Sequence, residues 1–177
     1  PVLPSTEPLP PRSSHTRRWL VIGALAATLA ASSSLATWRD DHAILINTTR
    51  SLPNWAFWID KHRRPARGDF VVFAPRQTPL VTAHFGKVSP PFAKRVYGMP
   101  GDMVTREGSV VRINGAEVSR LKPVSSRGEP LEPGPTGRIP EHCYYVGTEH
   151  KDGLDSRYAD IGFVCSARII GTGDSLL

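Results

Sequence analysis

A lysine within an apolar, strand-like run is the residue of this sequence best suited to acid–base chemistry. In the run FAKRVYG (92–98), Phe92, Lys94 and Val96 occupy alternate positions and therefore share one face of a strand. If that face is buried, loss of hydration lowers the pKa of Lys94 from about 10.4 toward roughly 7 or 8, where the neutral amine is a competent general base. The strand pattern alone favours the alternative, a lysine that reaches solvent from a strand edge.

The candidate nucleophile is Ser51, in the segment NTTRSLPNW (47–55) that follows a strand-like run. Pro53 fixes the backbone close behind it, and a serine in such a turn can present its hydroxyl to a cleft. Together the two residues suggest attack on a carbonyl carbon by a serine whose proton passes to the amine. An ordinary turn serine fits the same residues.

Short strands are the elements that would position this pair, because apolar runs bounded by turn residues recur along the chain. Asn114-Gly115 is typical of a two-residue hairpin. Residues 75–91 and 119–140 are predicted to be long loops, either lids over a cleft or tolerated insertions. The predicted fold is mainly β, an antiparallel body behind one N-terminal transmembrane helix. The predicted strands are 42–47, 55–59, 69–74, 92–98, 143–147 and 163–171, together with the stretch 103–118, which is interrupted at Glu107-Gly108 and at Asn114-Gly115.

Composition fits such a body, since 17 Pro and 15 Gly among 177 residues favour turn-rich β structure over a helical bundle. The net charge is +6, but the Lys and Arg residues are scattered and form no basic helix, so nucleic acid is not an expected partner. A nearby anionic membrane surface explains the charge better. The six His residues fit no metal-ligand spacing, and neither a metal nor another cofactor is expected.

The clearest physical signal is WLVIGALAATLAASSSLATW (19–38), twenty residues without a charge and with Trp at both ends. Its length suits a hydrocarbon core of about 30 Å, and the Trp residues suit the two interfaces. Arg12, Arg17 and Arg18 precede it, so the positive-inside rule keeps the N-terminus in the cytoplasm. We predict a disordered cytoplasmic tail (1–18), a transmembrane anchor (19–38) and a periplasmic catalytic domain (39–177). A cleaved signal peptide is the alternative, because Ser34 and Ala36 are small residues at cleavage-site spacing.

Two cysteines, Cys143 and Cys165, lie in the part predicted to be exported, each within a strand-like run. A disulfide and a pair of small buried core residues fit the sequence equally well.

Several stretches, in their order along the chain, resemble the signal peptidase I family of Ser/Lys proteases. They are most similar to its conjugation branch, the pilin-maturation peptidases called TraF. The likeness covers residues 47–171. The stretches are NTTRSLPNWAFW (47–58), RGDFVVF (67–73), KRVYGMPGDMV (94–104), VRINGAEV (111–118) and YYVGTEHKDGLDSRYADIGFV (144–164).

The resemblance implies roles for the matching residues. Ser51 would attack the scissile carbonyl, and neutral Lys94 would take its proton. The Ser51 backbone N–H and the Thr49 hydroxyl would form the oxyanion hole. Asp155 and Arg157 would form an ion pair that supports the Lys94 pocket, and Asp155 counts as functionally required in the TraF branch.

The chain also departs from the family pattern. Gly153 stands where a serine usually orients the lysine, and Thr148 and Glu149 replace an Asp-Asn pair. We therefore expect Ser156 or Asp155 to hold Lys94 instead.

The function that the resemblance implies is that of a membrane-anchored serine endopeptidase, in the inner membrane and facing the periplasm. It would process a propilin of a conjugation or type IV secretion system, with the acyl group passing to water or to the pilin's own N-terminal amine. The expected partners are the propilin or another exported precursor, the inner membrane and components of the conjugation pore. The alternatives are a general signal peptidase I, a non-catalytic scaffold relative and a Ser/His/Asp hydrolase that uses His150.

Overall fold

The computed structural model describes residues 14–46 and 52–176, and the chain divides into two compact units, Pro1–Asp40 and Asp41–Leu177. The described part of the first unit is a helix, α1, which spans Ser14–Asp41 and ends where the second unit begins. It begins before the predicted anchor and ends after it. Its stretch His15–Asp41 is long and apolar enough to cross a membrane.

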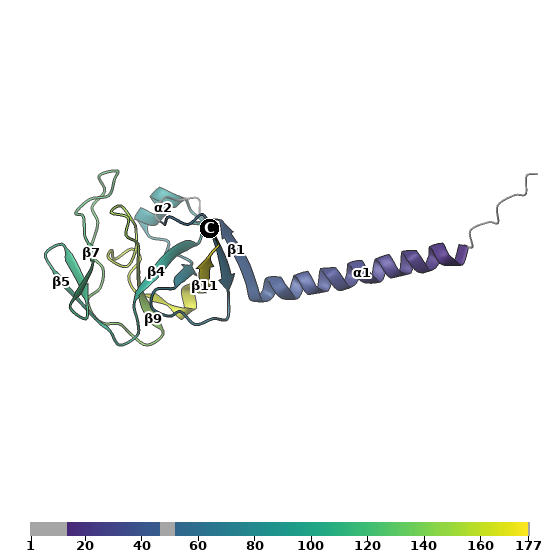
Figure 1. Ribbon diagram of the computed structural model, residues 1–177. Coiled ribbons are helices and arrows are strands. Elements are labelled where there is room, and N and C mark those ends of the chain that lie inside the picture. Colours follow the sequence, from purple (N-terminus) through teal and green to yellow (C-terminus); the bar gives the residue numbers. More distant parts are fainter. Residues whose placement is uncertain (1–13, 47–51, 177) are drawn as a thin grey trace, which may run out of the picture. The chain divides into compact units, whose positions relative to one another are not determined.

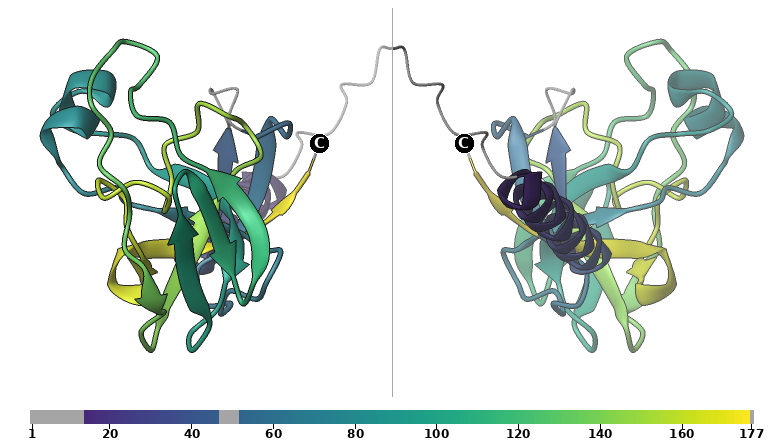
Figure 2. Two further views of the ribbon diagram at one scale, coloured as in Figure 1. Left: turned by 90° about the vertical axis from the view of Figure 1, so that its left-hand side faces the viewer. Right: turned by 90° about the vertical axis from the view of Figure 1, so that its right-hand side faces the viewer.

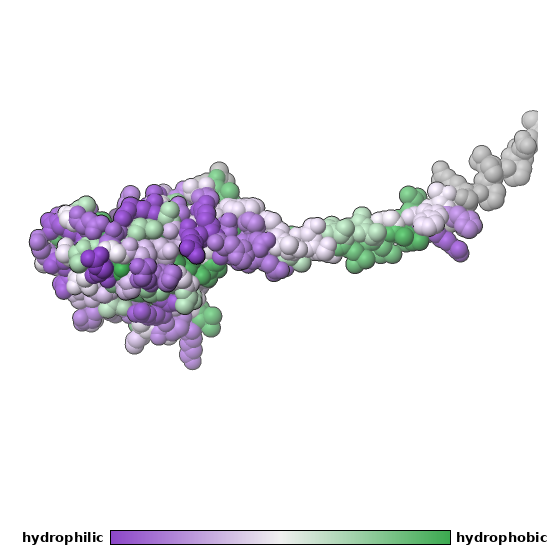
Figure 3. Space-filling model, turned by 90° about the horizontal axis from the view of Figure 1, so that it is seen from below, coloured by the Kyte–Doolittle hydropathy of each residue, from purple (hydrophilic) through white to green (hydrophobic). Residues whose placement is uncertain are grey.

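Polar residues inside α1 satisfy their own hydrogen bonds. The hydroxyls of Ser32 and Ser33 each donate to the carbonyl three residues earlier, at 2.8 Å. Such bonds lower the cost of placing a hydroxyl in hydrocarbon, because the group needs no water. Figure 3 shows the hydrophobic side chains concentrated in the N-terminal part of the helix and fading toward its C-terminal part.

The second unit is built on a seven-stranded antiparallel sheet, in the order β1-β2-β11-β3-β4-β9-β10 (Figure 1). This confirms the predicted mainly β class. Its strands are β1 His42–Ile46, β2 Ala56–Asp60, β3 Phe70–Phe73, β4 Phe92–Gly98, β9 Cys143–Gly147, β10 Val164–Cys165 and β11 Ile169–Ser175. Strand β11 reaches the middle of the sheet because Gly171 and Gly173 leave room for Ile59 of β2. A Cβ atom at either glycine would lie 2.5 or 2.8 Å from that side chain.

A second, four-stranded sheet has the order β7-β6-β5-β8. The turn Asn114-Gly115 joins β6 to β7 with Ile113 paired directly to Ala116, so the predicted two-residue hairpin is confirmed. Both turn residues have positive φ, 50° and 84°, as this turn type requires. The strands are β5 Met103–Glu107, β6 Val110–Ile113, β7 Ala116–Arg120 and β8 Gly137–Arg138.

The run predicted as one strand at 163–171 is two strands. A single turn of 3₁₀ helix, Ser166–Arg168, separates β10 from β11. Strand β10 then pairs with β9 at the sheet edge, whereas β11 lies between β2 and β3. Cys143 and Cys165 are direct partners across β9 and β10 and form a disulfide, which decides between the two alternatives left open by the sequence.

The predicted loop at 75–91 contains a helix, α2 (Pro79–Phe85). Thr78 caps it by accepting a hydrogen bond from the Val81 N–H at 3.3 Å, and Pro79 occupies the first turn. A capping residue followed by proline is a helix-start signal, so this helix was readable from the sequence. Figure 2 shows α2 beside the long segment that follows β7, and the Arg127 guanidinium donates to the Ala83 carbonyl between them.

Candidate active site

Lys94 is buried in the middle of β4. Burial alternates along this strand, with Phe92, Lys94 and Val96 inside and Ala93, Arg95 and Tyr97 partly exposed. Only 5% of Lys94 is exposed, and its two neighbours on the same face belong to the main hydrophobic core. The prediction that these residues share one face is confirmed, and that face is buried. The lysine reaching solvent, which the strand pattern alone favoured, is wrong.

The electrostatic surroundings make the Lys94 amine easy to deprotonate. Burial is the largest influence and lowers the pKa of Lys94 to about 8. The negative charge of Asp155 raises this pKa, and the positive charge of Arg157 lowers it. A substantial share of Lys94 is therefore neutral at mildly alkaline pH, as a general base must be.

Asp155 and Arg157 form a buried ion pair behind this lysine. Nε and Nη2 of Arg157 donate to the two carboxylate oxygens of Asp155, each at 2.8 Å. The exposed fractions of the two side chains are 0% and 4%. The carboxylate also accepts from the backbone N–H groups of Arg157 and Thr148, each at 3.1 Å. Such full satisfaction is what allows a charge pair to be buried.

Ser156 has a different set of partners from the one we expected of a lysine-orienting group. Its fully buried hydroxyl donates to the Gly162 carbonyl at 2.8 Å and accepts from the Val146 N–H at 2.9 Å. These bonds fasten the segment that carries Asp155 to strand β9.

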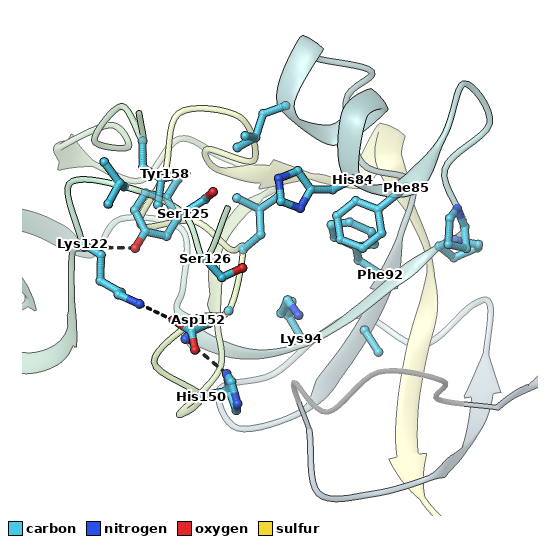
Figure 4. Close-up of a pocket in the computed structure, with 18 of the residues that line it drawn as sticks. His84, Phe85, Phe92, Lys94, Lys122, Ser125, Ser126, His150, Asp152 and Tyr158 are labelled. Atoms are coloured by element: carbon cyan, nitrogen blue, oxygen red, sulfur yellow. Dashed lines mark hydrogen bonds and ion pairs between the residues drawn. The ribbon is translucent and has the colours of Figure 1, made fainter. Parts of the chain in front are cut away.

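A cavity of about 340 Å³ lies in front of Lys94, and Figure 4 shows the amine among its lining side chains. One end of β1, part of β4, helix α2 and the segments 122–131 and 150–158 form its wall. Both predicted long loops contribute to this wall, which favours lids over a cleft rather than mere insertions. The apolar lining residues are Leu45, Ile46, Leu80, Phe85, Pro90, Pro91, Phe92, Ala93, Val124, Leu131 and Leu154.

Two polar pairs at the cavity, one hydrogen-bonded and one ionic, were not predicted. Nε2 of His84 lies 3.0 Å from Oε1 of Glu129, which joins α2 to the segment after β7. Lys122 pairs with Asp152. No sequence signal pointed to either pair, because each joins residues of distant segments whose contact depends on the tertiary fold.

His150, the base of the alternative Ser/His/Asp mechanism, also lines the cavity. Its Nδ1 accepts a hydrogen bond from the Asp152 backbone N–H at 3.2 Å, so this nitrogen is engaged by the main chain rather than by a carboxylate. In the described part of the chain, no three His, Cys, Asp or Glu side chains gather where they could hold a metal ion.

The predicted nucleophile Ser51 and the predicted oxyanion residue Thr49 lie outside the described residues. The segment that contains them connects Ile46 to Leu52, and both of these residues are described. Ile46, at the end of β1, lines the cavity together with Lys94, and Leu52 is buried in a core cluster with Phe57 and Phe70.

The burial of Lys94 predicts a cost in stability that depends on pH. Its pKa is about 8 in the folded protein and 10.5 in the unfolded chain. Between these values the unfolded chain binds the proton more strongly, so stability rises with pH and the cost disappears above about pH 10.5. Below about pH 8 the buried ammonium costs about 3 kcal/mol. Lys94→Met is therefore expected to raise the free energy of unfolding at pH 7 by up to about 3 kcal/mol.

Urea unfolding of the full chain in detergent at neutral and strongly alkaline pH measures this effect. Lys87→Met, at an exposed lysine, is the matched control and should change stability by less than about 0.5 kcal/mol. A gain from Lys94→Met that is the same at both pH values would contradict the burial of a titrating amine.

Comparison with known proteins identifies the family. The family model described as "Signal peptidase, peptidase S26" matches residues 16–177. A signal peptidase I from Enterococcus faecalis has a solved structure that is 27% identical, with a TM-score of 0.38, covering 62% of this chain and 96% of that one. No curated protein matches the chain. Because the family model spans almost the whole sequence, this chain belongs to the peptidase S26 family of signal peptidases and is a membrane-anchored peptidase.

Proposed function

We propose that this chain is a serine endopeptidase with a Ser51/Lys94 dyad, and that it processes a conjugative propilin at the periplasmic face of the inner membrane. The observation that carries the proposal is the buried Lys94 amine, with its pKa lowered to about 8, on the wall of a cavity. A lysine in an apolar site that can shed its proton is a suitable general base and an unfavourable purely structural residue.

The assignment of Ser51 rests on sequence and on its neighbours in the chain. Ser51 lies in the short segment between Ile46, which lines the same cavity as Lys94, and Leu52, which is buried in the core. Consecutive Cα atoms are about 3.8 Å apart. A connection this short limits how far Ser51 can lie from Ile46 and Leu52. This supports, by chain connectivity, a nucleophile that works at the cavity.

The proposed reaction runs through an acyl-enzyme. Neutral Lys94 takes the hydroxyl proton of Ser51 as the oxygen attacks the scissile carbonyl carbon. The Ser51 N–H and the Thr49 hydroxyl stabilise the resulting oxyanion. When the C–N bond breaks, the Lys94 ammonium gives its proton to the leaving amine. Water or the pilin's N-terminal amine then attacks the ester carbonyl carbon, and Lys94 accepts the proton of the attacking group. As the ester C–O bond breaks, Lys94 returns this proton to the departing Oγ of Ser51, which restores the hydroxyl and the neutral amine.

The cavity supports a substrate with apolar side chains beside the scissile bond, since most of its lining residues are apolar. Membrane-inserted propilins and the leader peptides of other exported precursors both have such segments. A general signal peptidase is therefore equally consistent with the family match, and the propilin preference rests on the resemblance to the TraF branch.

Ser51→Ala and Lys94→Met are each expected to abolish cleavage, because one removes the nucleophile and the other the base. Losses of at least about a thousandfold are expected, as for residues that act as a unit. The measurement is processing of a co-expressed propilin, followed by mass spectrometry. Ser126→Ala is the matched control at an exposed serine that lines the same cavity.

Full activity of Ser51→Ala and Lys94→Met would favour a scaffold role. Loss of activity in Ser126→Ala but not in Ser51→Ala would move the nucleophile to residue 126. Inactivation by His150→Ala together with a mild effect of Lys94→Met would instead support the Ser/His/Asp mechanism.

The rate of acylation is expected to rise with pH. Below the Lys94 pKa of about 8, the fraction of neutral amine grows about tenfold per pH unit, and the rate should follow it to a plateau above that value. Single-turnover cleavage of a fluorogenic peptide by the full chain in detergent measures the profile. A rate that falls as pH rises through this range, with the fold intact, would exclude Lys94 as the base.

The identity of the products separates the two substrate classes. Co-expression with the pilin of the same genetic element is expected to give a trimmed pilin, absent with Ser51→Ala. A product lighter by one further water would show that the pilin amine, rather than water, accepts the acyl group. Efficient cleavage of ordinary leader peptides, with the propilin left intact, would identify a general signal peptidase.

A further inference from the structure

We propose that Thr148 is the residue that positions the Lys94 amine; this inference rests on the proposed role of Lys94 as base. Strands β4 and β9 pair Val96 with Val146 and Arg95 with Gly147. The ladder ends at Gly147, the last residue of β9; continued by one residue, the same register places Thr148 opposite Lys94. Directly opposed residues place their side chains on the same face, with Cβ atoms about 5 Å apart.

Thr148 is rigidly held in this place. Its N–H donates to Oδ2 of Asp155 at 3.1 Å, and its carbonyl accepts from Nη2 of Arg157 at 2.8 Å. The side-chain hydroxyl accepts from the His150 N–H at 3.2 Å. The residue is 2% exposed. The ion pair thus fixes the backbone that carries the threonine, one residue beyond the last pair of β4 and β9.

Gly153 lies against the side chain of Thr148. It lines the cavity together with Lys94. A Cβ atom at this position would lie 2.0 Å from Cγ2 of Thr148, so any other residue here would displace the threonine. The other neighbours of that Cβ are the His150 carbonyl oxygen at 3.1 Å, which would have to shift slightly, and Oδ2 of Asp155 at 3.4 Å. The threonine methyl group is therefore by far the closest obstacle to a side chain at this position.

This geometry gives a test with matched variants in the full chain. Thr148→Val keeps the shape and removes the hydroxyl, and it is expected to lower kcat about tenfold with little change in KM. Thr148→Ser keeps the hydroxyl and should retain most of the activity. Gly153→Ala should be impaired because its methyl group meets Cγ2 of Thr148.

The double variants distinguish positioning from packing. Thr148→Ser combined with Gly153→Ala has room for the new methyl group and keeps the hydroxyl, so activity should recover. Thr148→Ala combined with Gly153→Ala has the same room but no hydroxyl, and it should stay impaired. Equal recovery in both would overturn the inference.

The pH profile supplies a readout that a purely structural role would not move. Replacing a hydroxyl by a methyl group beside Lys94 makes its surroundings more apolar, so the profile of Thr148→Val should shift to lower pH. The charged and titratable groups around Lys94 are unchanged in all variants; they are Asp155 and Arg157 behind it and His84, Lys122, His150 and Asp152 around the cavity. Thermal unfolding of each variant in detergent confirms that the fold is intact.

Failure of this inference and failure of the proposed function have different signatures. An inactive Lys94→Met with a fully active Thr148→Val, unshifted in pH, overturns the role of Thr148 and leaves the dyad standing. An active Lys94→Met overturns the dyad itself, and with it any positioning role for Thr148.

Discussion

The buried amine of Lys94 is the constraint around which the body of this protein is organised. An ammonium group inside an apolar wall is energetically unfavourable. Such a group is most often found at functional sites, where neighbouring charges compensate its own. Here the wall is the core face of β4, and the balance comes from Asp155, whose charge is in turn held by Arg157. The position and charge of Lys94 thus depend on strand β4, on the Asp155–Arg157 ion pair and on the segment that carries this pair.

That segment is fastened at several points. The Ser156 hydroxyl accepts a hydrogen bond from the Val146 N–H of β9, and the Arg157 guanidinium donates to the Thr148 carbonyl. The Cys143–Cys165 disulfide joins β9 to β10. Rigid surroundings keep the pKa of a buried residue constant, because small displacements of neighbouring charges in a low-dielectric site change that pKa strongly. These contacts therefore hold the charged groups that influence the Lys94 pKa in fixed positions.

Local patterns in the sequence were enough to predict most of the strands. Alternation placed Phe92, Lys94 and Val96 on one face of β4, although the strand pattern alone favoured a Lys94 that reaches solvent. Asn114-Gly115 located a hairpin to the residue. What failed were features decided over longer distances. The 163–171 run looked continuous because its composition is strand-like throughout, yet Ser166–Arg168 turn the chain toward a different part of the sheet.

The candidate site was predictable to a similar degree. Lys94, Asp155 and Arg157 lie near one another as the sequence resemblance implied, whereas the roles of Ser51 and Thr49 remain predictions outside the described residues. The cavity wall could not be read from the sequence, because it is assembled from segments far apart in the chain. The contacts of Ser156 and Thr148 depend on backbone register, which composition does not encode.

The order of strands in the large sheet has a consequence for how this protein matures. Strand β11, near the C-terminal end of the described chain, lies between β2 and β3, which come from the first half. Neither of those early strands can pair with β11 until the ribosome has made this last strand, Ile169–Ser175. Because the chain is made from its N-terminal end, one edge of β2 and one edge of β3 stay unpaired until β11 has been synthesised. Long-range closure of this kind is slow, so the large sheet is completed late in folding.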